Sequence, residues 1–200
     1  MEKITNNFDA IKNWLTFNDE SFYFIQIMKR RKDIPDLSSN SIDIATYYVK
    51  SLKGLEKLKP DIIKICDALN ARAYISTYPA YPEKTALNTI AKITQHLMSG
   101  ETMASCRAWE SSCANSTSTV FLIDVDTKDE NLVTRLENNI FDITKNPNTV
   151  LLKLETPNGF HLITKKFDRT IINKELIELD FFEIKTRAST LLYFKQTIIF

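Results

Sequence analysis

Two aspartates at the end of an apolar segment are the first residues of this sequence that could do chemistry. Residues 119–126 read Thr-Val-Phe-Leu-Ile-Asp-Val-Asp. The apolar run predicts a buried strand, and alternation along a strand places Asp124 and Asp126 on the same face. Two such carboxylates repel each other unless a cation lies between them, and oxygen ligands suit Mg²⁺ or Mn²⁺. The spacing therefore predicts a divalent-metal site; the alternative is a strand that ends in an Asp-containing turn.

A second polar group follows at a tight turn. Residues 156–161 read Thr-Pro-Asn-Gly-Phe-His. Proline fixes one backbone dihedral and Asn and Gly tolerate positive φ, so a β-hairpin is expected over residues 149–165. The N–H groups of Asn158 and Gly159, the Thr156 hydroxyl and His161 form a polar cradle suited to phosphate oxygens. The alternative is a structural histidine on a strand.

Further charged residues lie on or beside expected strands. Glu183 is flanked by apolar residues, and burying its carboxylate is costly unless it is paired or bound to metal. Lys185 shares its face, so a simple salt bridge is the alternative. Four lysines and arginines are candidates for contacts with triphosphate or nucleic-acid backbone: Lys153, Lys165, Lys185 and Arg187. In the basic run that ends at Lys32, we expect Arg30, Arg31 and Lys32 either to form a solvated edge or to bind phosphate, as they would along a template strand.

The pattern of apolar residues indicates which elements position these groups. We expect helices over residues 2–17, 55–69, 85–98 and 130–143, one or two helical turns over 174–179, and strands at 22–28, 42–49, 72–76, 119–126, 150–155, 160–164, 181–186 and 190–196, the last two paired with each other. Residues 99–118 read as a loop with at most a short helix, and Trp109 as a residue that fills the core. The second half thus approaches the ferredoxin-like order, and Asp129 is placed to cap its helix.

Composition limits the class of protein. The chain has 200 residues, 44% hydrophobic and 26% charged, which is typical of a soluble globular protein. Its formal net charge of +1 means that a nucleic-acid partner would need a local basic surface. There is no apolar run that could span a membrane and no signal peptide, so we expect no membrane partner and a cytoplasmic location. Three cysteines without metal-ligand spacing, Cys66, Cys106 and Cys113, are expected to be reduced thiols.

The combination of these motifs resembles the archaeo-eukaryotic primase superfamily, which includes the primase-polymerases of plasmids, phages and mobile elements. Its first motif is matched by Asp124 and Asp126, and its second, a small residue followed by any residue and His, by Gly159-Phe-His161. Its third, an acidic residue after an apolar pair, is matched best by Glu183. The family usually has Asp there, and Asp180 is the alternative. The resemblance covers about residues 119–196.

This resemblance implies an α+β fold with an N-terminal α/β lobe, residues 1–118, and an RRM-like (ferredoxin-like) lobe, residues 119–200, whose sheet is mostly antiparallel. It implies a DNA primase or polymerase that transfers nucleotides from an NTP or dNTP to a 3′-hydroxyl on a single-stranded DNA template. Asp124, Asp126 and Glu183 would hold Mg²⁺ or Mn²⁺, and His161 would contact the phosphates. With glycines only at positions 54, 100 and 159, no phosphate-binding Walker motif is possible. Any helicase activity would therefore come from a separate helicase or replication protein, or from a region beyond Phe200.

Three other functions use similar residues. A non-catalytic primase-like protein would bind nucleotide or nucleic acid and assist a replication complex. A haloacid-dehalogenase-type phosphatase also carries Asp-x-Asp at a strand end, but it requires Thr or Val where this chain has Lys128. A glycosyltransferase with a metal-binding Asp-x-Asp would leave the turn and His161 unexplained.

Overall fold

The structure, a computed structural model, describes residues 2–100, 105–114 and 118–197. Its first half contains the elements β1 (Glu2–Asn6), α1 (Phe8–Trp14), β2 (Tyr23–Arg30), β3 (Ser41–Val49), α2 (Leu52–Leu69), β4 (Arg72–Ser76), α3 (Pro82–Met98) and α4 (Ser105–Ala114). Its second half contains β5 (Val120–Val125), α5 (Glu130–Thr144), β6 (Val150–Glu155), β7 (Phe160–Lys165), the 3₁₀ turn η1 (Arg169–Ile171), α6 (Lys174–Glu178), β8 (Phe182–Lys185) and β9 (Ser189–Thr197).

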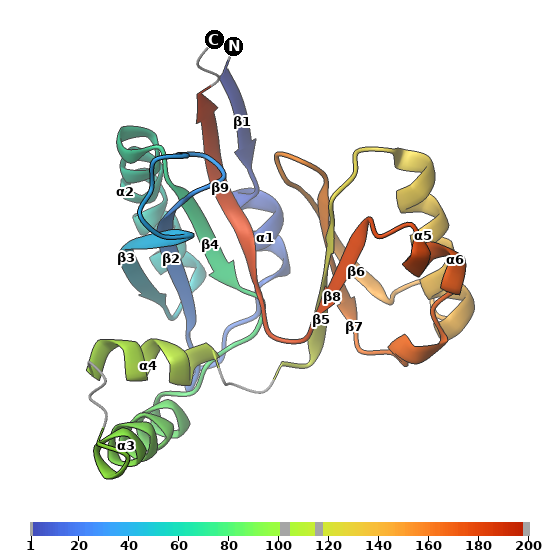
Figure 1. Cartoon of the computed structure of the whole chain (residues 1–200). Coiled ribbons are helices and arrows are strands. Elements are labelled where there is room, and N and C mark those ends of the chain that lie inside the picture. The colour runs from blue at the N-terminus through green and yellow to red at the C-terminus, as the bar shows by residue number, and fades with distance from the viewer. Residues whose placement is uncertain (1, 101–104, 115–117, 198–200) are drawn as a thin grey trace.

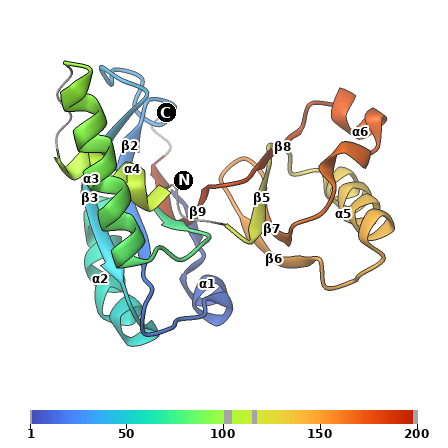
Figure 2. The same cartoon turned by 90° about the horizontal axis from the view of Figure 1, so that it is seen from below.

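The strands form two separate sheets. The first has the order β1-β9-β4-β2-β3 and the second the order β6-β7-β5-β8. Every strand pairing among the described residues is antiparallel, which confirms the α+β class. Figures 1 and 2 show the two sheets as two bodies side by side, with α1–α4 around the first sheet and α5 and α6 on the second.

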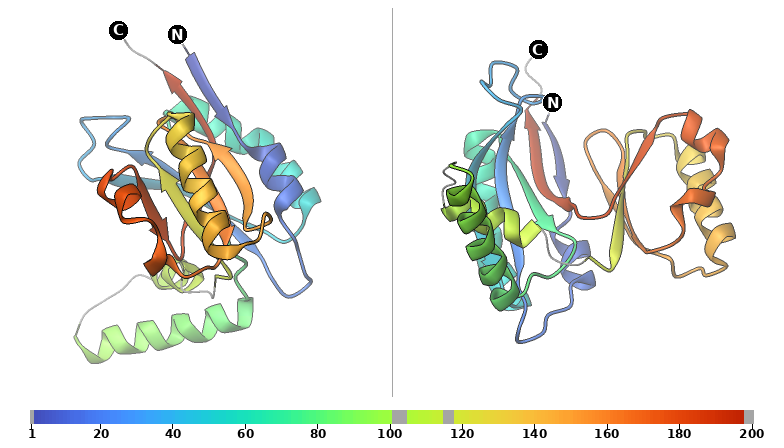
Figure 3. Two further views of the ribbon diagram at one scale, coloured as in Figure 1. Left: turned by 90° about the vertical axis from the view of Figure 1, so that its right-hand side faces the viewer. Right: turned by 60° about the horizontal axis from the view of Figure 1, so that its bottom comes forward.

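Alternation along the strands explains why the second sheet packs on both faces, one against α5 and the other toward the first sheet. Ile123, Val125 and Leu162 point to one face and pack in a buried cluster with Val133 and Leu136 of α5. In Figure 3 this helix lies on the side of the sheet that faces away from the first sheet. The intervening residues of the same strands point the other way, toward the first sheet. The connection β-α-β-β-α-β with this strand order is that of the ferredoxin-like motif, as the sequence predicted.

The helix of this second sheet begins at a capping side chain and ends at a left-handed residue. The Asp129 side chain accepts a hydrogen bond from Asn131 N, so it caps α5 as expected. Lys145 ends the helix in the left-handed conformation. The hairpin predicted at residues 149–165 is formed by β6 and β7.

The first sheet uses the same principle with α2. Ile25 of β2 and Ile75 of β4 are fully buried in one cluster with Leu55 and Ile62 of α2. Ser51 caps the helix by accepting from Gly54 N. The opposite face of β2 and β4 carries polar side chains that line the candidate site.

The last strand leaves the sheet that precedes it. The prediction that residues 181–186 pair with 190–196 is wrong: β8 pairs with β5, and β9 lies between β1 and β4 in the first sheet. The helix predicted over residues 2–17 is also wrong in its first part, because Glu2–Asn6 forms β1 against β9. Pairing between residues this far apart leaves no local pattern in the sequence.

The predicted loop over residues 99–118 contains one helix, α4, while residues 101–104 and 115–117 lie outside the described part of the chain. Trp109 stacks on Phe22 with ring centroids 6.3 Å apart and fills a small cluster there, as expected. Cys66 and Cys113 are buried free thiols, and the Cys106 side chain is outside the description. Within the described residues, no helix combines the length and the apolar character needed to cross a membrane.

Candidate functional site

The faces of the two sheets that point toward each other border one cavity of about 280 Å³. The second sheet and its hairpin contribute Asp124, Asp126, His161, Lys185 and the turn residues Thr156, Pro157 and Asn158. The first sheet contributes Gln26, Met28, Arg30, Arg72, Tyr74, Ser189 and Leu191, and Lys32 follows β2. A concave site with convergent charged groups between two sheets is the best candidate for ligand binding in this fold.

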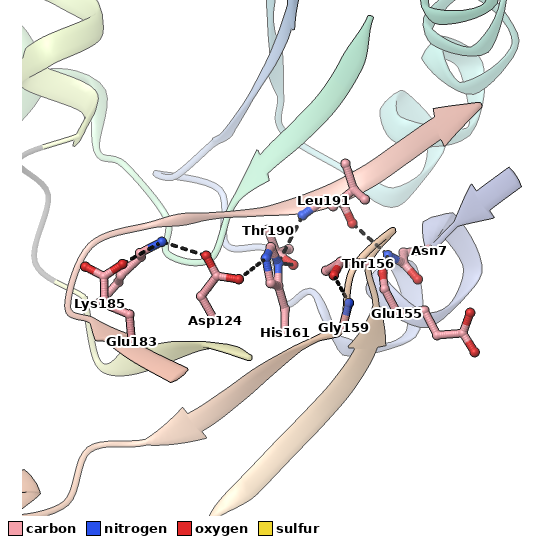
Figure 4. A network of polar contacts seen from close by, with 10 residues as sticks. All are labelled: Asn7, Asp124, Glu155, Thr156, Gly159, His161, Glu183, Lys185, Thr190 and Leu191. Carbon is pink, nitrogen blue, oxygen red and sulfur yellow. Dashed lines mark hydrogen bonds and ion pairs between the residues drawn. The ribbon is translucent and has the colours of Figure 1, made fainter. Parts of the chain in front are cut away.

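Asp124 is the centre of the charged group. It lies directly opposite His161 on β7 and opposite Glu183 on β8. Its Oδ1 is 3.2 Å from His161 Nε2, and its Oδ2 is 2.7 Å from Lys185 Nζ (Figure 4). Burial opposes ionisation, but hydrogen bonds from His161 and Lys185 hold the pKa of Asp124 well below its usual range. The carboxylate is therefore charged at neutral pH.

The hydrogen bonds of His161 define which ring nitrogen carries its proton. Nδ1 lies 2.9 Å from Thr190 Oγ1 and accepts a hydrogen bond from Leu191 N at 3.4 Å. A backbone N–H can only donate, so Nδ1 is unprotonated in this arrangement. Nε2 then carries the proton, and its N–H donates a hydrogen bond to Asp124 Oδ1. The first sheet thus orients, through β9, a histidine that belongs to the second.

Lys185 joins the two acidic residues on either side of it. Its Nζ lies 3.1 Å from Glu183 Oε2 as well as 2.7 Å from Asp124. Its own partial burial lowers the pKa of Lys185, but the hydrogen bonds to the two carboxylates outweigh this and raise it. Carboxylates placed opposite each other on neighbouring strands repel, and the ammonium group relieves that repulsion.

The oxygen donors suit a hard divalent cation, as Asp124, Asp126 and Glu183 share one region of the second sheet. The ammonium of Lys185 is a stand-in cation between two of these carboxylates. No group of three His, Cys, Asp or Glu side chains in the described part of the chain is arranged to hold a metal as it stands. A metal shared by Asp124 and Glu183 would therefore require Lys185 to move.

The residues of the turn between β6 and β7 have two different roles, since some line the cavity and one lets the backbone pack closely. Thr156 and Asn158 line the cavity, whereas Gly159 N donates to Thr156 Oγ1 at 3.0 Å. A Cβ on Gly159 would lie 1.9 Å from Val125 O. The glycine thus lets the hairpin approach the backbone at the end of β5.

Asp126 and Glu183 are both exposed, but only Asp126 lines the cavity. Asp126 follows β5, and its backbone N donates to Phe181 O at 2.8 Å. The Glu183 side chain is 72% exposed and reaches the site only through Lys185. The alternative third acid, Asp180, has a φ of 47° in a turn and is not among the lining residues.

Several predicted phosphate contacts lie elsewhere. Lys153 points to the helix-covered face, where its Nζ is 3.0 Å from Glu130 and 4.6 Å from the centroid of the Phe160 ring. Its position opposite Leu162 explains this, because that register belongs to the covered face. Arg31 donates to Leu37 O, away from the cavity. Lys165 and Arg187 are exposed and do not line the cavity.

Other contributors could not be found from sequence motifs. Asn7 donates to Glu155 O and to Leu191 O, each at 2.9 Å, and so ties the hairpin to β9. Arg72 and Thr190 come from strands of the first sheet. Only the folding of β9 beside β4 brings them to the site, and the local sequence around them carries no signal beyond that of an ordinary strand.

Comparison of the chain with protein families, with curated proteins and with solved structures found no significant match to any of them.

Proposed function

We propose that the cavity binds a nucleoside triphosphate and that the protein is a metal-dependent nucleotidyltransferase of the primase-polymerase kind. Asp124 and Asp126 would hold Mg²⁺ or Mn²⁺, with Glu183 joining them once Lys185 has turned away. When bound, the metal would lower the charge of the phosphates and of the attacking 3′-oxygen. Single-stranded DNA would serve as template.

The observation that supports this proposal best is the position of Asp124 between His161 and Lys185 on the face of the second sheet that borders the cavity. His161 Nε2 and Lys185 Nζ are hydrogen-bond donors that converge on one carboxylate at 3.2 and 2.7 Å. Donors gathered in this way can turn to phosphate oxygens when a metal takes over the carboxylate. Thr156 and Asn158 border the same cavity and add polar groups from the turn.

Incorporation of labelled nucleotides on single-stranded DNA with Mn²⁺ or Mg²⁺, with and without a primer, tests this function. Asp124→Asn is the informative variant, because it keeps the shape of the side chain and removes the charge. We expect it to abolish incorporation. Glu178→Gln is the matched control, because Glu178 is an exposed carboxylate at the end of α6 and outside the cavity. Absence of both incorporation and metal-dependent nucleotide binding in the unsubstituted protein would reject the proposal.

A second candidate is a protein that binds nucleotide or nucleic acid without synthesis. The specific observation in its favour is that both oxygens of Asp124 are already engaged, one by His161 and one by Lys185. If this arrangement persists with ligand, nucleotide would bind without added metal. Incorporation separates the two functions: the binding protein would bind a nucleoside triphosphate in calorimetric titration but incorporate none with Mn²⁺ or Mg²⁺, whereas the transferase would incorporate it.

A further inference from the structure

The wall of the cavity that belongs to the first sheet carries three cations. Arg30, at the end of β2, Lys32, just after it, and Arg72 on β4 line the cavity together with Asp124. We call these three residues the cationic wall. They lie on a different sheet from His161 and Lys185, so they are an independent set of donors.

The geometry of the sheet explains how these residues come together. Met28 lies opposite Arg72 in the β2–β4 register, and alternation puts Arg30 on the same face of β2 as Met28. The chain then turns sharply, because Arg30 O accepts from Asp33 N at 2.9 Å and from Ile34 N at 3.1 Å. This turn places Lys32 beside the strand end.

Asp33 clamps this turn to the sheet. Its Oδ2 lies 2.6 Å from Arg72 Nε and its Oδ1 lies 2.5 Å from Arg72 Nη2, a bidentate pair. The side chains are only 6% and 5% exposed, and the guanidinium lies 4.4 Å from the centroid of the Phe194 ring. A bidentate pair buried on an aromatic face holds the arginine and the turn in one geometry.

The cationic wall keeps an excess of positive charge. Asp33 neutralises Arg72, whereas Arg30 and Lys32 form no ion pair with any residue that the structure describes. Partial burial, followed by the charges of Arg72 and Arg30, lowers the pKa of Lys32. Asp33 and Asp124 act in the opposite direction on that pKa, but Arg30 and Lys32 remain as two cations beyond the one that Asp33 neutralises, and such an excess attracts a polyanion.

We propose that the cationic wall binds the polyphosphate tail of the nucleotide and that Asp33 is its positioning residue, an inference that rests on the proposed function. A nucleic-acid strand needs cations spread along an open groove. Here they gather on one side of a cavity of about 280 Å³, close to the size range of small-molecule sites. Across that cavity, a metal on the carboxylates would face the same phosphates. The assignment moves Arg30 and Lys32 from a template strand to the nucleotide.

Calorimetric titration with inorganic triphosphate, in EDTA, measures this site without metal or catalysis. Arg30→Gln and Lys32→Gln are each expected to weaken binding about fivefold to tenfold, as expected for loss of one charged contact. Arg31→Gln is the matched control. It removes the same charge between Arg30 and Lys32, but the Arg31 side chain points outside the cavity. Equal weakening by Arg31→Gln, or no weakening by the first two variants, would overturn the proposal.

Asp33→Asn tests the positioning role, because electrostatics and positioning predict opposite results. The substitution makes the protein more positive, so general attraction predicts tighter binding of triphosphate. Loss of the clamp predicts weaker binding. Asp36→Asn, an exposed residue of the same turn, is the control for charge. Circular dichroism verifies that Asp33→Asn folds. If Asp33→Asn does not fold, Lys32→Gln, at an exposed residue, still tests the cationic wall.

Two further measurements separate this inference from the proposed function. The first is binding of a single-stranded oligonucleotide. If Arg30→Gln and Lys32→Gln weaken this binding but leave triphosphate binding unchanged, the two residues contact the template and the inference is rejected. The second is nucleotide incorporation. If triphosphate binding depends on the cationic wall but the protein incorporates no nucleotide, only the proposed transferase function is rejected. Incorporation whose KM for nucleotide is unchanged in both variants would reject the wall alone.

Discussion

Lys185 Nζ lies 2.7 Å from Asp124 Oδ2 on the neighbouring strand, and the same ammonium also reaches Glu183. The protein thus carries its own monovalent cation between two carboxylates that would otherwise repel. A divalent metal and this ammonium cannot both occupy that position. In the proposed function, Lys185 would therefore compete with the metal, and metal binding would release it toward phosphate.

Lys185→Met should raise the affinity of the protein for Mn²⁺. Removal of the competing charge should raise the Mn²⁺ affinity about fivefold to tenfold. The corresponding free energy is a modest part of the Coulomb energy of such a pair near a protein surface. Electron paramagnetic resonance of free Mn²⁺ measures the change. Lys165→Met, at the exposed end of β7, should leave the affinity as it was. Weaker Mn²⁺ binding by Lys185→Met would show that the lysine supports the metal.

Asp124→Asn should destabilise the protein in a pH-dependent manner. The folded pKa of Asp124 is depressed, so its charge contributes stability above the unfolded pKa of about 4, and this is lost as the pH falls further. We expect a loss of about 1.5–3 kcal/mol at neutral pH, which shrinks below about pH 4. Urea denaturation at a series of pH values measures it. Asp126→Asn, at an exposed residue, should show little change. A difference that stays constant down to pH 3 would contradict the assignment of Asp124.

Gly159→Ala should destabilise the protein by about 1–3 kcal/mol or more, because the added carbon would clash with the backbone oxygen of Val125, which β5 holds in place. Thermal unfolding gives the loss. Gly54→Ala is the comparison, because its new carbon would meet a side-chain oxygen of Ser51 at 3.3 Å and alanine favours a helix. Similar stability of Gly159→Ala and the unsubstituted protein would mean that the turn is not held against β5.

Asn7→Asp should weaken the connection between the two sheets. The Asn7 side-chain amide donates to Glu155 O and to Leu191 O, and a carboxylate of the same shape would place acceptor against acceptor. Buried acceptors left without donors predict a loss of about 2–3 kcal/mol or more in the free energy of unfolding, measured with urea. Asn6→Asp is the neighbouring control, because Asn6 Oδ1 only accepts from Phe8 N, a bond that aspartate retains. Equal stability of Asn7→Asp and the unsubstituted protein would contradict this role.

The geometry around Asp124 was accessible from sequence because it depends on local patterns. Alternation placed Asp124 and Asp126 on one face of their strand and Glu183 and Lys185 on one face of theirs, and the Pro-Asn-Gly turn predicted the strand that carries His161. Their proximity follows from the ferredoxin-like order, in which β5 is flanked by β7 and β8.

The first-sheet side of the cavity was not accessible in this way. Arg72 read as part of a short strand and Asp33 as part of a loop, and nothing in their spacing relates them to Asp124. Lys153 was predicted to contact phosphate, but the β6–β7 register turns it to the helix-covered face. Contacts between sheets depend on the path of β9, and no periodicity within that segment indicates which sheet it joins.

The position of β9 also has a consequence for the order in which the chain can fold. β1 is an edge strand whose partner is β9, so Glu2–Asn6 is synthesised early and finds its strand partner only after Ser189–Thr197 has left the ribosome. The second sheet lies between them in the sequence and can form first, since β5 to β8 pair among themselves. Completion of the first sheet, and with it the hydrogen bonds from β9 to His161, can therefore follow formation of the second sheet.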